Sequence, residues 1–173
     1  MRKQSILISI LWFAVYPLYS YDFLGLPKPA YDLYEIGGGA SQHPSANIFL
    51  LGYKNGTKLN DQLGLWQEYG IQYNYEHEND SKQRHTINID YGGVWGSAAF
   101  LALKVHAVLP LTLTNQGKFS TGIGGRISYV LFGISMYYEI SATNGEGSSL
   151  QEKAGIMLSI PICRETYCLG RLG

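Results

Sequence analysis

The stretch A-F-L-A-L-K-V-H-A-V-L-P-L-T-L, residues 99–113, decides how the chain folds. Every second residue from Ala99 to Leu113 is apolar, whereas the residues between them include Lys104 and His106. A repeat of two residues is typical of an extended strand whose side chains alternate between two faces. We therefore expect a β-strand with one wholly apolar face and one face that carries charge.

The same alternation recurs along the chain. Polar or glycine-containing turns separate the alternating segments, such as Asn55-Gly56 and Asn115-Gln116-Gly117. Besides 99–113, we expect strands near residues 31–40, 46–54, 64–77, 84–95, 118–130, 134–141 and 153–162. The sequence thus predicts an all-β, eight-stranded antiparallel up-and-down barrel over residues 31–162. An extended lead-in (21–30) precedes it and a tail (163–173) follows it.

The composition narrows the class of protein. Charged residues make up 15% of the chain, against roughly 25% in ordinary soluble domains, whereas Gly (21 residues) and Tyr (14) are abundant. The formal net charge is zero, so we expect no nucleic-acid partner. Cys163 and Cys168 are close enough in sequence to form a small disulfide. They have no neighbouring histidine, and we expect neither a metal nor a cofactor.

The first twenty residues have the pattern of a signal peptide. Arg2 and Lys3 precede an apolar run over Ser5–Tyr16, and Ser20 is small enough for a cleavage site. The apolar run is shorter than a membrane-spanning helix requires. We therefore expect export of the chain through residues 1–20. An uncleaved interfacial or buried helix is the alternative.

Two closures of the barrel fit the alternation. The apolar face meets lipid in a membrane barrel, whereas it lines a ligand cavity in a secreted, lipocalin-like binder. Several strands span about a dozen residues, enough to cross a bilayer at a tilt. Tyrosines gather near the strand ends, as in an aromatic girdle. These features favour the membrane barrel over the binder and over a β-sandwich.

Residues 31–162 resemble, in length and pattern, the small outer-membrane barrels of bacteria. This group includes the OmpA transmembrane domain, the OmpX-like barrels and the PagL-type lipid A deacylases. The resemblance implies a bacterial outer-membrane location, contact with membrane lipid and lipopolysaccharide, and insertion by the barrel assembly machinery. It leaves the oligomeric state open.

The polar face carries eight titratable side chains that we expect to point into the barrel. Charges in such a low-dielectric space need partners, so we expect a salt-bridge network that fills the lumen. A narrow polar pore is the alternative, and a catalytic or proton-relay role for His106 is a weaker one. The eight residues are Glu68, Glu76, Arg84, Asp90, Lys104, His106, Arg126 and Glu139.

His43-Pro44-Ser45 is the strongest candidate for enzyme chemistry. The PagL-type deacylases resemble it in using a His-x-Ser pair with a glutamate. A histidine activates a serine only at hydrogen-bond distance and with an orienting acid, and the sequence identifies no such acid. We therefore expect a non-enzymatic outer-membrane protein with a structural or surface-exposed role. A hydrolase that uses His43 and Ser45 and a secreted ligand binder remain the alternatives.

Overall fold

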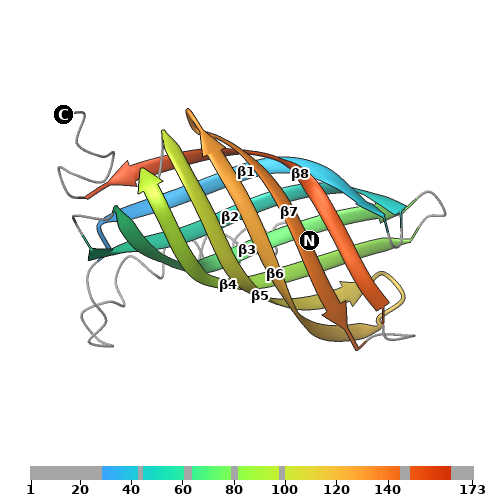
Figure 1. Ribbon diagram of the computed structural model, residues 1–173. Helices are drawn as coiled ribbons and strands as arrows, with labels where there is room; N and C mark the ends of the chain where they lie inside the picture. The colour runs from blue at the N-terminus through green and yellow to red at the C-terminus, as the bar shows by residue number, and fades with distance from the viewer. Residues whose placement is uncertain are drawn as a thin grey trace, which may run out of the picture.

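The computed structural model describes residues 29–42, 45–60, 64–78, 82–97, 100–144 and 149–164, which form a closed barrel of eight antiparallel strands (Figure 1). The signal-peptide prediction for residues 1–20 lies outside these ranges. The strands are β1 (Tyr31–Gln42), β2 (Ser45–Asn60), β3 (Leu65–Glu78), β4 (Gln83–Ser97), β5 (Leu101–Thr114), β6 (Phe119–Leu131), β7 (Ile134–Thr143) and β8 (Ser149–Cys163).

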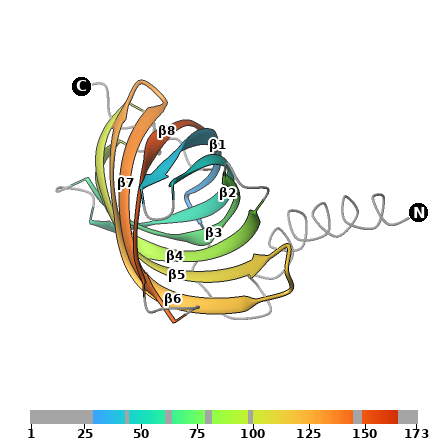
Figure 2. The same cartoon turned by 90° about the vertical axis from the view of Figure 1, so that its right-hand side faces the viewer.

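The first and last strands close the barrel. β1 pairs with β8 from Tyr31↔Cys163 to Ser41↔Lys153, and every other strand pairs with its neighbours in sequence (Figure 2). Closure leaves no unpaired sheet edge. We call the end where β1 begins and β8 finishes the terminal end, and the opposite one the far end. The up-and-down, all-β fold predicted from the sequence is confirmed, and a sandwich is excluded.

The apolar face points outward. On β5, Leu103 and Leu113 are 44% and 49% exposed, whereas Lys104 and His106 are each 1% exposed. The burial pattern alternates in the same way along β7. A lipocalin-like binder needs the opposite orientation, with apolar side chains lining the cavity, so that alternative is wrong.

The second strand is longer than predicted. Asn55-Gly56 is not a turn, because Asn55 pairs with Asp32 and Gly56 with Tyr31 inside the β1–β2 ladder. Gly56 serves a different purpose, since a Cβ at this position would overlap the ring of Tyr31. The chain therefore uses this glycine to make room for a buried aromatic ring.

Other inward glycines also lie opposite large side chains. Gly70 is paired with Lys54 and Gly92 with His106, and in both cases an added Cβ would collide with the partner strand. A narrow barrel must be filled by its own side chains at the density of a protein interior. The glycines let long polar side chains cross the interior.

An apolar cluster closes the terminal end of the interior. The ring of Trp66 meets that of Tyr31 edge-on with centroids 5.5 Å apart, and its indole N–H donates to the carbonyl of Gly96 at 3.0 Å. The cluster consists of Ala30, Tyr31, Leu33, Trp66, Val94, Ala102 and Val130.

In the described parts of the chain, no helix is long and apolar enough to span a membrane.

Candidate functional site

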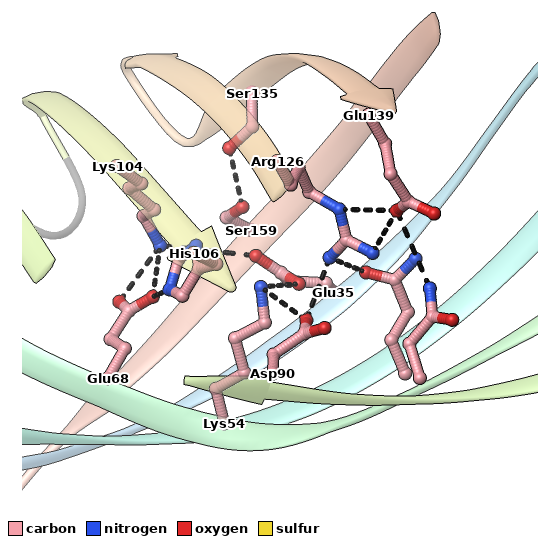
Figure 3. Close-up of polar contacts among 12 residues, drawn as sticks. Glu35, Lys54, Glu68, Asp90, Lys104, His106, Arg126, Ser135, Glu139 and Ser159 are labelled. Atoms are coloured by element: carbon pink, nitrogen blue, oxygen red, sulfur yellow. Dashed lines mark hydrogen bonds and ion pairs between the residues drawn. The ribbon is translucent and has the colours of Figure 1, made fainter. Parts of the chain in front are cut away.

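The inner wall carries a network of ionisable side chains. All eight polar-face residues singled out in the sequence lie there with at most 9% exposure. Each sits at an inward position of its strand, as the alternation requires. Figure 3 shows six of them, from β3 to β7, converging inside the barrel: Glu68, Asp90, Lys104, His106, Arg126 and Glu139.

Glu68 is the centre of the part nearest the terminal end. The ammonium of Lys104 donates to its two oxygens at 2.9 and 3.2 Å, and the hydroxyl of Tyr31 donates at 2.6 Å. His106 Nε2 lies 3.2 Å from Glu68 Oε2. His106 is therefore packed as a partner of a buried carboxylate, with a glycine opposite it to make room.

Arg126 is the centre of the middle part. Its guanidinium Nε donates to Glu139 Oε2 at 2.9 Å, and Nη1 donates to Asp90 Oδ2 at 2.7 Å. Nη1 also donates to the amide oxygen of Gln72 at 2.5 Å. Asn88 adds a longer contact to Glu139 at 3.5 Å. This fork of donors satisfies groups on β3, β4 and β7 at once, which suits the fixed geometry of arginine.

Two residues that the sequence analysis missed connect these parts. Lys54 Nζ lies 3.0 Å from Glu35 and 3.2 Å from Asp90. Glu35 also lies 3.9 Å from Lys104, on the Glu68 side. Both are fully inside the barrel, and Figure 3 shows them between the other two groups.

The far-end part runs through a third missed residue, Lys153. It bonds to Glu76 and lies 4.0 Å from Glu139. Glu76 in turn pairs with Arg84 at 2.9 Å, and Arg84 reaches Glu78 at 3.3 Å. Acidic and basic side chains thus alternate from the terminal-end cluster to the far end.

The buried charges of this interior ion-pair network balance among the described residues. Each charge touches the opposite sign, which is the condition for keeping ions in a low-dielectric interior. Removing one partner leaves an uncompensated charge, at a cost of about 3–5 kcal/mol. The basic members are Lys54, Arg84, Lys104, Arg126 and Lys153, and the buried acidic members are Glu35, Glu68, Glu76, Asp90 and Glu139.

Two of the three missed residues, Glu35 and Lys54, lie where the alternation is weak. Glu35 precedes Gly37-Gly38-Gly39, which carry no side chains to mark a face. Lys54 follows a segment whose inward Ile48 and Leu50 are as apolar as its outward residues, and it stands next to the misassigned turn. Counting every second residue back from Gly56 would have placed Lys54 on the inner wall.

The structure describes only one residue of the candidate enzyme pair, His43 and Ser45. Ser45 is exposed as the first residue of β2, and His43 lies outside the described residues. Within the described ranges, no carboxylate or histidine is hydrogen-bonded to Ser45.

Cys163 is disulfide-bonded, whereas its predicted partner Cys168 lies outside these ranges. Among the described residues, no three His, Cys, Asp or Glu side chains are grouped to hold a metal ion.

The closed eight-stranded barrel with an apolar exterior and an ionic interior has the fold of the small outer-membrane β-barrels. The solved structure of the outer membrane enzyme PagL superposes with a TM-score of 0.50 and 15% identity, covering 75% of this chain and 99% of PagL. The fold implied by the sequence resemblance is therefore confirmed. At this identity the likeness concerns the fold alone.

Two further solved barrels are similar with lower scores. Neisserial surface protein A has a TM-score of 0.46 at 11% identity, covering 75% of this chain and 95% of that protein. A designed transmembrane β-barrel has a TM-score of 0.44 at 16% identity, covering 78% and 98%. No protein-family model and no curated protein matches the sequence.

Proposed function

We propose that this chain is an integral protein of a bacterial outer membrane, exported through residues 1–20, with a structural or surface-exposed role. The observation that carries the proposal is the outer wall. Large apolar side chains cover it on every strand from β4 to β8, with exposures such as 71% for Ile123 and 58% for Ile156. Soluble monomers rarely expose a continuous apolar surface of this extent.

The polar groups of the outer wall also suit a bilayer. Several are bonded to a tyrosine hydroxyl on the adjacent strand, so little hydrogen-bonding capacity faces outward. Gln67 donates to Tyr91 at 2.7 Å nearer the terminal end, and Tyr73 bonds to His85 at 2.7 Å nearer the far end. Tyrosine is favoured at both membrane–water interfaces because its ring is apolar and its hydroxyl is polar.

The filled interior supports a protein that does not conduct ions. The ion-pair network occupies the middle of the lumen, and the apolar cluster around Tyr31 and Trp66 closes the terminal end. Eight-stranded barrels are commonly just wide enough for their own side chains. The partners we propose are therefore the surrounding outer-membrane lipid, including lipopolysaccharide, and the machinery that inserts barrels.

Membrane fractionation tests this proposal. The full chain, expressed in a Gram-negative host, is expected in the outer-membrane fraction, to resist a high-pH wash and to require detergent for extraction. Purified protein reconstituted in planar lipid bilayers is expected to show no stable conductance steps. A mature protein that stays in the soluble fraction without detergent contradicts the membrane assignment, whereas discrete conductance steps contradict the closed interior.

A further inference from the structure

One side of the far end differs from the rest of the outer wall. On β3, Tyr73, Tyr75 and His77 point outward between buried Asn74 and Glu76, and on β4 His85 points outward next to buried Arg84. The corresponding outward residues of β5 and β6 are Leu113 and Phe119. A bilayer surrounds all strands alike, so it does not by itself explain two histidines on one side.

His85 is held in place by tyrosines. Its Nδ1 lies 2.7 Å from the hydroxyl of Tyr73, and its ring is stacked on Tyr73 and tilted against Tyr75, with centroids 6.1 and 5.4 Å away. When the tyrosine hydroxyl donates to Nδ1, the proton of a neutral imidazole is on Nε2. A protonated imidazole also carries a proton there. In both states Nε2–H is a donor available to a ligand.

His77 provides a second imidazole beside the first. Tyr75 is paired with His85 and His77 with Gln83, so the two histidines are diagonal neighbours on adjacent strands. Such neighbours lie about 7–8 Å apart, within reach of one small group. Lys82, which is exposed and whose carbonyl accepts the Glu78 N–H at 3.0 Å, adds positive charge at the same hairpin end.

The charges around the two histidines favour an anionic ligand. Among the described residues, no carboxylate faces outward on the far-end half of β2, β3 or β4. Among the described residues, the nearest acids are Glu78 and Glu76, and both pair with the inward-facing Arg84. On the β7–β8 side, by contrast, the outward Tyr138 is hydrogen-bonded to Glu152, which would repel an anion.

We propose that His77, Lys82 and His85 form a binding site for the phosphate of a membrane-lipid headgroup, with Tyr73 and Tyr75 positioning the His85 ring. This inference rests on the proposed membrane location, because the site lies on the wall that lipid surrounds. A lipid occupies it with its acyl chains along the apolar surface below, on residues such as Ile71 and Ile87. Charge-assisted hydrogen bonds to the phosphate oxygens supply the preference.

Native mass spectrometry of the full chain in detergent tests the site, with dioleoyl phosphatidic acid as the probe. Two lipids serve for comparison: phosphatidylcholine, whose phosphate is masked by choline, and diacylglycerol, which has no phosphate. We expect wild type to bind phosphatidic acid about tenfold more tightly than either, a difference of about 1.4 kcal/mol. The double variant His77→Gln, His85→Gln is expected to lose this preference. Tyr138→Phe, on the outer wall in the middle of β7, is expected to keep it.

Each alternative outcome overturns the inference. Equal binding of the three lipids by wild type, or an unchanged preference in the double variant with a far-UV spectrum like that of wild type, removes the site. Displacement of phosphatidic acid by inorganic phosphate at matched concentration shows a site for the free ion rather than for a lipid. If the chain is not detergent-dependent in fractionation, the membrane assignment itself fails. If it is, and the lipids bind equally, only the headgroup site fails.

Discussion

Neighbouring residues of β5 meet two different media. Lys104 and His106 point to the interior and are paired with Glu68, whereas Leu103 and Val105 point outward with no polar partner. Some polar groups outside, such as Gln67 and Tyr91, are bonded in a neutral pair. The middle of the inner wall thus balances full charges against each other, whereas this part of the outer wall uses a hydrogen bond that a tyrosine completes.

The strongest way to break the inner wall is Arg126→Met. The substitution leaves Asp90 and Glu139 as buried carboxylates without their main partner, so we expect a loss of about 3–5 kcal/mol in the free energy of unfolding. Urea titration of the detergent-folded protein, followed by tryptophan fluorescence, measures it. Adding Glu139→Gln to the variant is expected to restore much of the loss, because the interior then again holds equal numbers of acidic and basic side chains. A loss below 1 kcal/mol would show that the charges do not depend on each other.

A charge placed on the outer wall tests the other side of the comparison. Val105→Lys puts an ammonium among outward-facing apolar residues, one position from Lys104. Near the middle of a bilayer this costs about 2–4 kcal/mol. The measurement is the same urea titration in lipid vesicles, with Val105→Leu as the control that keeps the surface apolar. A neutral effect of the lysine would place this wall in water.

Two adjacent glycines of β4, one inward and one outward, allow the inner and outer walls to be compared. A Cβ at the inward Gly92 would collide with the backbone of Val105 and His106, whereas a Cβ at the outward Gly93 meets only the ring of Trp95 at 3.5 Å. Gly92→Ala is therefore expected to cost about 1–3 kcal/mol through overpacking. Gly93→Ala is expected to be neutral or slightly stabilising. Equal effects in thermal unfolding would mean that the interior is looser than the structure shows.

The smallest effect is expected for a single outer-wall hydrogen bond. Tyr91→Phe removes the hydroxyl that accepts from Gln67 at 2.7 Å and keeps the ring. We expect a loss of about 0.5–1.5 kcal/mol, in the range of one neutral hydrogen bond. The double variant with Gln67→Leu is expected to recover it, since no polar group is then left facing lipid. Additive losses in this double-mutant cycle would show that the pair does not interact.

Much of the fold is predictable because a strand period of two is local information. The Lys104/Leu103 alternation and the two-residue β6–β7 turn at Phe132-Gly133 follow from short stretches of sequence. The direction of the apolar face needed further cues, namely tyrosine placement and strand length. Closure of β1 on β8 joins residues more than a hundred positions apart, and no local pattern encodes that pairing.

The interior network was only partly predictable, for a related reason. The two-residue alternation predicts that Arg126 and Glu139 face inward, but it does not show which of several carboxylates an arginine contacts. Arg126 bonds Gln72 across 54 positions, and Lys153 bonds Glu76 across 77. Gly56 shows the limit most clearly, because its role as space for Tyr31 depends on a ring from another strand.

The pairing of β1 with β8 also determines when the barrel can close. The partner of Tyr31 is Cys163, so the first strand keeps an open edge until β8 has been synthesised. Such long-range pairing makes folding slow and leaves the unfinished sheet prone to aggregation. Closure of the barrel therefore has to wait until β8 has been synthesised.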